Sequence, residues 1–265
     1  MSSWFIQDED MSAVQEEEKR QTRKYGPNRF YMRGGETKDI VLVDDNPACV
    51  YEHNPRINGH WRNWFTCLQN VEDDVVCCRK LGPETRYLAG YLTVVDCSKW
   101  VDKKGKEHQF DIKLVQGKIK TLKRWQRKKS EHDTLEGALF KVTREDGKSP
   151  SCGDEWSFQR LADTDKLFEH VKYKGKLLSE LWAEAEQDEE KMENLMLVFD
   201  IKPDENGKLP RKIVPFNYYE LLKPKSSQEI SALLGGVQKD DDSSANTSSS
   251  ASSGSSAPRE DSVPF

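Results

Sequence analysis

The sequence lacks a long apolar run, and this absence limits where the protein can reside. Residues 1–20 contain no hydrophobic segment of the kind that a secretion signal requires. No other segment approaches the roughly 20 apolar residues of a membrane-spanning helix. The sequence therefore predicts a soluble protein of the cytoplasm that has no membrane partner.

Signature motifs of the common enzyme classes are also missing. The chain contains no phosphate-binding G-x-x-x-x-G-K-[ST] loop, no G-x-S-x-G nucleophile turn and no H-E-x-x-H metal motif. Asp39, Asp44 and Asp45 offer carboxylates of the kind that a metal-dependent nuclease uses. These acids fall at a strand end and in a turn, however, where aspartate is ordinary. We therefore expect no catalytic activity.

Cysteine is sparse and scattered, with 6 cysteines in 265 residues. Small disulfide-stabilised proteins concentrate their cysteines in a short chain, and a reducing compartment keeps thiols free. The cysteines are therefore expected to be free thiols or metal ligands. They are Cys49, Cys67, Cys77, Cys78, Cys97 and Cys152.

Neither sign of charge is in large excess, since the formal net charge is −5. The distribution is more informative than the total. Residues 99–148 contain 15 Lys and Arg against 8 Asp and Glu, a net of +7. Residues 240–265 contain five acids and one Arg, a net of −4. Such asymmetry predicts a nucleic-acid-binding surface combined with an acidic arm.

Local composition divides the chain into three parts. Residues 1–27 form an N-terminal arm, and residues 8–24 are predicted to be helical because acids come early and bases late. We expect this arm to mediate self-association along a nucleic-acid strand. Residues 28–236 form the folded core with a helical extension. Residues 237–265 form a Ser- and Gly-rich tether with an acidic tip, expected to be a disordered acidic tail.

The core segment alternates short strand patterns with turn signals. Helical periods predict helices at residues 118–129 and 177–194. Strands are predicted at residues 29–33, 39–43, 48–53, 60–67, 87–95, 110–115, 137–144, 154–160 and 195–199. Short strands at close spacing predict a mainly β fold with added helices, organised as a small β-barrel with helical decorations.

Cationic and aromatic side chains are interleaved along this core. A single strand of nucleic acid exposes phosphates to cations and bases to aromatic rings, so the pattern predicts single-strand binding without sequence preference. Two structural alternatives stay open. Strand aromatics such as Phe30, Trp64 and Tyr91 often pack in a core, and the basic run at 118–129 can be a solvated helix face. The predicted DNA-binding residues are Arg29, Tyr31, Arg33, Trp61, Arg62, Trp64, Lys118, Lys120, Lys123, Arg124, Trp125 and Arg127.

The chain ends in an acidic cluster followed by a Pro-Phe pair. Phe265 can fill a small apolar pocket of a partner, with Pro264 presetting the backbone. Glu260, Asp261 and the terminal carboxylate can meet Lys or Arg around that pocket. We expect this tip to recruit replication or repair proteins. A folded body, a tether and an acidic Pro-Phe tip resemble the layout of bacterial-type single-stranded DNA-binding proteins.

Five segments between Arg29 and Trp100 carry a family resemblance. They are RFYMRGG at 29–35, IVLVDD at 40–45, VYEHN at 50–54, GHWRNWFTC at 59–67 and YLTVVD at 91–96. Together they resemble a family of bacteriophage single-stranded DNA-binding proteins of the helix-destabilising type. The resemblance implies an OB-type β-barrel, single-strand protection during phage DNA replication, recombination and repair in the host cytoplasm, and no catalysis.

The resemblance also raises the question of a metal. In T-even phage members, one His and three Cys bind zinc beside the DNA groove, and His53, Cys67 and Cys77 have a similar spacing here. The pattern then departs, because no C-x-x-C follows and the adjacent Cys77 and Cys78 seldom both bind one tetrahedral ion. Cys97 or Cys49 could complete the shell instead. Two interpretations stay open for His53, Cys67, Cys77 and Cys78: a zinc site, or free thiols that pack as small apolar groups.

Two other functions stay open as well. An RNA-binding or transcription-associated protein on the same fold would show the same pattern, because contacts to the 2′-hydroxyl are invisible in a sequence. An assembly adaptor that works through its tail is the other. DNA binding by a chain that ends near Gly236 would distinguish the adaptor from the main interpretation.

Overall fold

The structure is a computed structural model, and it describes residues 27–57, 64–71, 75–102, 105–144, 157–163 and 167–235. The predicted arm helix at 8–24 and the predicted tether and tip therefore lie outside the described residues. Within the described residues, no helix has the length and apolar character needed to cross a membrane.

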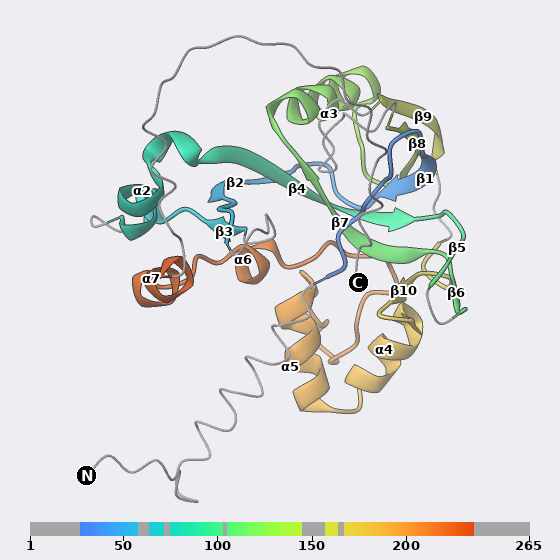
Figure 1. Ribbon diagram of the computed structural model, residues 1–265. Helices are drawn as coiled ribbons and strands as arrows, with labels where there is room; N and C mark the ends of the chain where they lie inside the picture. The colour runs from blue at the N-terminus through green and yellow to red at the C-terminus, as the bar shows by residue number, and fades with distance from the viewer. Residues whose placement is uncertain are drawn as a thin grey trace, which may run out of the picture.

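One large sheet organises the described residues into a mixed α and β structure (Figure 1). Its hydrogen-bonded path runs β11-β10-β7-β4-β1-β8-β9, and β2 joins it at β4. Pairing is antiparallel except between β10 and β7. The strands are β1 (Thr37–Leu42), β2 (Ala48–His53), β3 (Phe65–Thr66), β4 (Tyr87–Asp96), β7 (Asp111–Gly117), β8 (Ala138–Thr143), β9 (Ser157–Asp163), β10 (Lys172–Tyr173) and β11 (Lys176–Leu177). A separate hairpin pairs β5 (Trp100–Val101) with β6 (Glu107–His108).

The sheet is open, so the expectation of a closed barrel is corrected for the described strands. The hydrogen-bonded path begins at β11 and ends at β9, and no pairing joins these two ends. Residues 29–33, predicted as a strand, instead belong to an extended segment that pairs with β7 through a single bridge at Arg29 and Leu114. The same segment reaches β8, where Arg144 donates to the Met32 carbonyl. The segment therefore contacts both β7 and the end of β8, but it forms no ladder of paired residues with either strand.

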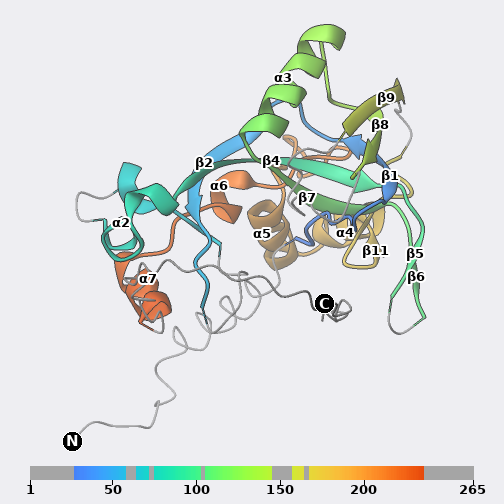
Figure 2. The same cartoon turned by 45° about the horizontal axis from the view of Figure 1, so that its top comes forward.

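The alternation of β4 separates two hydrophobic cores. Side chains along a strand point to opposite faces in turn, so Tyr91 and Val95 face one way and Leu92 and Val94 the other. Tyr91 and Val95 pack against the C-terminal third of the chain. Leu92 and Val94 pack in the core that also contains Trp125 of α3 (Ile119–His132). Figure 2 shows α3 on one side of the sheet and the C-terminal helices on the other.

Two glycines allow α3 to lie close to the sheet. Gly90 of β4 and Gly117 of β7 are paired in register, so both present backbone at the same place. A Cβ at Gly90 would lie 2.2 Å from a Leu122 methyl carbon, and one at Gly117 would lie 2.8 Å from the Trp125 ring. A Cβ at Gly117 would press against the buried Thr121 and Trp125, and one at Gly90 would require the Leu122 side chain to move.

The C-terminal third is largely helical. Its helices are α4 (Leu178–Ala185), α5 (Glu189–Val198), α6 (Tyr218–Leu221) and α7 (Ser227–Leu234). The sequence prediction of a strand at 195–199 is wrong, because α5 continues to Val198 and Phe199 forms an isolated bridge with Phe216. Leu195 and Phe199 fill the core with Phe168 and Trp182, whereas Met196 and Leu197 are exposed. The apolar run therefore does not require strand geometry.

A smaller third core lies at the end of β2. It is built from β3, the 3₁₀ turn η1 (Leu68–Asn70), α2 (Val76–Leu81), a second 3₁₀ turn η2 (Pro83–Thr85) and α7. We call this group the small lobe. Ile230 and Leu234 of α7 pack with Phe65 and Cys77, so the C-terminal end of the described core stabilises the small lobe. A capping box between Ser226 and Glu229 begins α7.

Candidate nucleic-acid interface and metal centre

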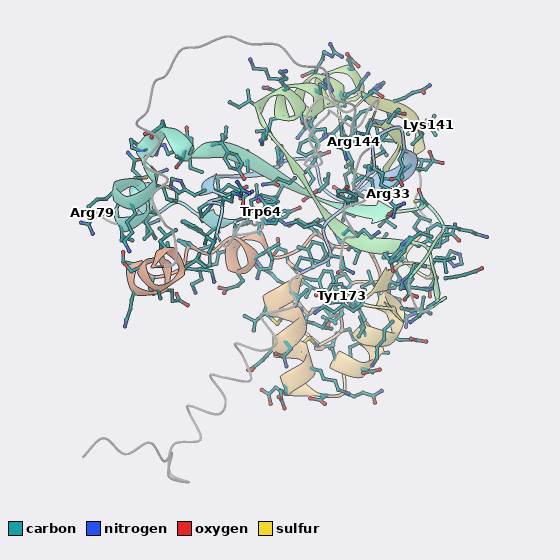
Figure 3. All side chains as sticks on the ribbon, in the orientation of Figure 1. Arg33, Trp64, Arg79, Lys141, Arg144 and Tyr173 are labelled. Carbon is teal, nitrogen blue, oxygen red and sulfur yellow. The ribbon has the colours of Figure 1, made fainter. Side chains whose placement is uncertain are left out.

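The extended segment before β1 carries an exposed stripe of cations and one aromatic ring. Arg29, Tyr31 and Arg33 are exposed, whereas Phe30 and Met32 between them are buried. Backbone bonds fix this alternation, because the Phe30 amide donates to the Leu114 carbonyl at 2.8 Å. The structure therefore places the three predicted binding residues of this segment on its solvent side. Figure 3 marks Arg33 on this stretch and Trp64 beside β3.

Arg29 is the best-positioned cation of the stripe. Its guanidinium carbon lies 4.4 Å from the centroid of the half-buried Trp64 ring and 5.6 Å from that of Tyr91. Its Nη1 donates to Gln116 Oε1 at 3.1 Å. These distances correspond to cation–π contacts with both rings. The structure therefore brings together Arg29 and Trp64, which are 35 residues apart in the sequence.

A buried carboxylate lies beneath this cation. Glu52 accepts hydrogen bonds from Tyr87 at 2.7 Å, from Tyr91 at 2.5 Å and from Gln116 Nε2. Burial raises the pKa of Tyr91, so its hydroxyl remains a donor at neutral pH. Each of the three donors is thereby held in one orientation, and Gln116 in turn orients Arg29.

A second cation lies over one of the same rings. Lys118 Nζ is 4.9 Å from the centroid of Tyr87, and Tyr87 in turn donates to Glu52. Sequence reasoning did not select Tyr87, Glu52 or Gln116 as site residues. For Glu52, the sequence signal was an acidic residue at a position of β2 where the alternation points the side chain inward. A buried acid requires several hydrogen-bond donors around it.

The side chains of α3 are divided between a face exposed to solvent and a face that packs on the sheet. Lys120, Lys123 and Arg127 are exposed and Arg124 is half-buried, as a solvated cationic face requires. Trp125 is 1% exposed and packs edge-on against Phe158 at 6.1 Å. The prediction that Trp125 stacks on bases is therefore corrected, because the ring faces the sheet at Gly117.

The predicted residues thus fall on two sides of the sheet. Arg29 and Trp64 lie with Tyr91 and Gln116 on one face, whereas α3 covers the face of Gly90 and Gly117. Part of the helix charge is internally neutralised, since Arg127 and Lys128 both pair with Glu131.

Outside the described residues are the predicted DNA-binding residues Trp61 and Arg62 and the predicted partner-binding residues Glu260, Asp261, Pro264 and Phe265.

The small lobe brings one His and three Cys together. Ligand atoms of His53, Cys67, Cys77 and Cys78 all lie within 4.8 Å of one another, a group that can hold a metal ion. Cys67 Sγ is 3.9 Å from Cys77 Sγ and 3.4 Å from Cys78 Sγ. Cys78 Sγ is 3.5 Å from His53 Nε2. Both adjacent cysteines therefore lie in the cluster, so the structure groups the same four candidate ligands that the sequence offered, although adjacent cysteines seldom both bind one tetrahedral ion.

The imidazole is oriented by a partner outside the cluster. Thr85 Oγ1 donates its own hydrogen to the Gly82 carbonyl at 2.8 Å. It therefore accepts the hydrogen bond that links it to His53 Nδ1 at 2.9 Å. This bond leaves the lone pair of Nε2 directed at Cys78. Ligating histidines in metal sites are typically fixed in this way through their second nitrogen.

Burial sets the protonation of the cluster. It raises the pKa of the Cys77 thiol and raises that of Cys78 to about 12. Burial, and then the charge of Arg86, lower the pKa of His53. Without a cation, the His53 imidazole and the Cys77 and Cys78 thiols are therefore neutral at pH 7. Binding of a divalent ion would remove thiol protons, which is the usual coupling between metal binding and pH.

Comparison of the chain with protein-family models, with curated proteins and with solved structures finds no match.

Proposed function

We propose that this protein binds single-stranded DNA without sequence preference and protects it during replication, recombination and repair. The observation that carries the proposal is the Arg29 guanidinium held over Trp64 and Tyr91. Lys118 over Tyr87 extends the same arrangement. Bases of any sequence stack on aromatic rings and guanidinium planes, while phosphates meet the surrounding cations.

The buried Glu52 supports a site for bases at this place rather than for phosphate alone. Its carboxylate contacts Tyr87, Tyr91 and Gln116, directly beneath the two cation–ring pairs. An acidic side chain there disfavours a second anion at Arg29 and leaves the half-buried Trp64 ring and the guanidinium plane for a neutral base. Tyr31 and Arg33 then provide the next contacts along the stripe.

The wider proposal includes an OB-type core of phage origin in the host cytoplasm. Its support is the sequence resemblance at 29–96 and the bent path by which residues 28–33 link β7 to β8. Residues 1–27 would mediate self-association on the strand. Residues 260–265 would recruit replication or repair proteins through Phe265.

We propose zinc as the occupant of the His53, Cys67, Cys77 and Cys78 cluster. Zinc favours thiolate and imidazole ligands in tetrahedral geometry, and a Zn–S length of about 2.3 Å places two sulfurs about 3.8 Å apart. The sulfur separations of 3.4 and 3.9 Å around Cys67 are close to that value. The ion would stabilise the small lobe, which carries Trp64 at the start of β3.

Substitutions at the interface test the DNA proposal. Trp64→Ala is expected to weaken oligo-dT binding by about 1–3 kcal/mol, because one stacking partner is lost, whereas Trp64→Phe should retain most of the affinity. Arg29→Ala should weaken binding comparably. Arg211→Ala removes an exposed cation far along the chain and serves as the control. Equal affinities of all four variants in a fluorescence-anisotropy titration would refute the interface.

Metal analysis tests the zinc proposal. The full chain is expected to hold one zinc ion, and Cys67→Ser or Cys78→Ser should lose it, because each removes a thiolate from a four-ligand site. Cys49→Ser changes an exposed cysteine outside the cluster and should retain the ion. Elemental analysis after dialysis measures the ratio. A zinc content that is equally low in the unmodified chain and in Cys67→Ser would contradict the assignment.

A further inference from the structure

A second pair of an aromatic ring and a cation lies on the other face of β2. Tyr51 is 38% exposed, and the guanidinium carbon of Arg86 lies 4.5 Å from its ring centroid. Tyr51 is paired in register with Leu88, whereas Glu52 is paired with Tyr87. Tyr51 and Glu52 therefore point to opposite faces, and the Tyr51 pair is separate from the Arg29 site.

Arg86 is held in place by the small lobe. Its Nη1 donates to Gln69 Oε1, and Gln69 belongs to η1 between the metal-cluster residues Cys67 and Cys77. The Sγ of Cys78 also lies 3.8 Å from Gln69 Oε1. Gln69 thus holds the guanidinium over the ring and is itself contacted by Cys78, which preorganises the pair for a ligand.

The two helices that lie on either side of β2 and β4 both carry exposed cations. Tyr51 shares its face of the sheet with Cys49, whose register partner Gly90 lies beneath Leu122 of α3. Figure 1 shows β2 and β4 running between α2 and α3. Arg79 of α2 and Lys120 of α3 are both exposed on these two helices. A strand of nucleic acid over Tyr51 would therefore meet positive charge at both ends.

We propose that Tyr51 and Arg86 form a second base-binding subsite for the same nucleic-acid strand. The ligand is a nucleobase of any identity, stacked on the exposed part of the tyrosine ring or on the guanidinium plane. Its phosphates lie toward the cations of α2 and α3. This subsite rests on the proposed function. It extends the proposed path of the nucleic-acid strand from the Arg29 stripe to the face of the sheet that α3 covers.

The subsite has a consequence for oligonucleotide length. One OB-type domain covers roughly 4–16 nucleotides of a single strand, depending on how many subsites are filled. A strand of about 4 nucleotides fills the Arg29 and Trp64 site alone. A strand of about 12 nucleotides reaches both faces. Removing Tyr51 therefore affects long strands more than short ones, whereas removing Trp64 affects both.

Anisotropy titrations of the full chain with fluorescent dT4 and dT12 test the proposal. Tyr51→Ala is expected to weaken dT12 binding roughly tenfold and to leave dT4 within about twofold, since one stacking contact is worth 1–3 kcal/mol. Tyr51→Trp should bind dT12 at least as tightly as the unmodified chain. Arg86→Lys keeps the charge but loses the planar group, and should weaken dT12 binding in the same direction.

The outcomes separate the two claims. If Trp64→Ala weakens dT12 binding and both Tyr51→Ala and Arg86→Lys do not, the second subsite is overturned and the first site stands. If the unmodified chain binds neither oligonucleotide, the proposed function fails and the subsite fails with it. Equal weakening of dT4 and dT12 by Tyr51→Ala would also overturn the subsite, because it would reflect a general loss of structure.

Discussion

At the scale of single residues, a chain of hydrogen bonds fastens the C-terminal third to the sheet. The Phe216 amide donates to Thr93 Oγ1 at 2.9 Å, and Thr93 Oγ1 lies 2.8 Å from the Tyr218 hydroxyl. Tyr218 donates to Asp44, which also accepts from the Thr93 amide at 3.1 Å. Burial raises the pKa of Asp44 from 3.8 to about 7, and these two hydrogen bonds only partly offset it.

The raised pKa of Asp44 predicts a stability that falls as pH rises. Between about pH 4 and 7 the folded state binds a proton that the unfolded state has lost, so each unit of pH costs up to about 1.4 kcal/mol. Asp44→Asn cannot titrate and keeps the acceptor oxygen. Its free energy of unfolding, relative to the unmodified chain, should therefore increase from pH 5 to pH 8. Urea unfolding at both values measures it, and a pH-independent difference would contradict the assignment.

Side-chain identity was enough to predict which residues of the segment 29–33 are exposed. The alternation of Arg29, Phe30, Tyr31, Met32 and Arg33 correctly indicates which side chains face solvent. The burial of Trp125 was not predictable from the basic run, because helical period alone does not state which side faces the sheet. The four candidate metal ligands could be named from the sequence, whereas their approach to one another depends on how η1 and α2 fold back on β2, which neighbouring sequence does not encode.

At the scale of elements, the close approach of α3 to the sheet is the feature most sensitive to a small change. Gly117→Ala places a Cβ within 2.8 Å of Thr121 and Trp125, both of which are buried. Since these neighbours have little room to move, we expect a loss of about 1–3 kcal/mol in the free energy of unfolding. Lys141→Ala on the exposed side of β8 is the control. Unchanged thermal unfolding of Gly117→Ala would show that α3 lies farther from the sheet.

Individual elements were more predictable than their arrangement. The strand predicted at 48–53 coincides with β2, and that at 87–95 falls one residue short of β4. Their alternation and β-branched residues are local signals. Whether the sheet closes depends on how distant segments position β9 and β11. Only long-range pairing decides this, so the expectation of a closed barrel was wrong.

At the scale of the whole molecule, β2 connects the two candidate sites. Glu52 contacts the rings beneath Arg29, and the next residue, His53, belongs to the metal cluster. Trp64 precedes Phe65, whose ring lies 5.6 Å from that of His53. Loss of the metal should therefore loosen Trp64 and weaken DNA binding. This coupling arises from adjacency in the chain, and it needs no movement between distant parts.

Charge distribution along the molecule sets the salt dependence of the proposed binding. The cations of 99–148 would neutralise phosphates and release counterions, so affinity should fall steeply between low and moderate salt. Stacking on Trp64 does not release counterions and should persist. A single strand can use both contributions, whereas a duplex offers phosphates but keeps its bases stacked inside.

The central claim is tested most directly by titrating the full chain with poly-dT and with a duplex of equal length, at two salt concentrations. The account predicts quenching of tryptophan fluorescence and at least tenfold tighter binding to poly-dT at both salts, with affinity falling as salt rises. An RNA strand of equal length shows whether the sugar is distinguished. Equal or tighter binding to the duplex would contradict the account.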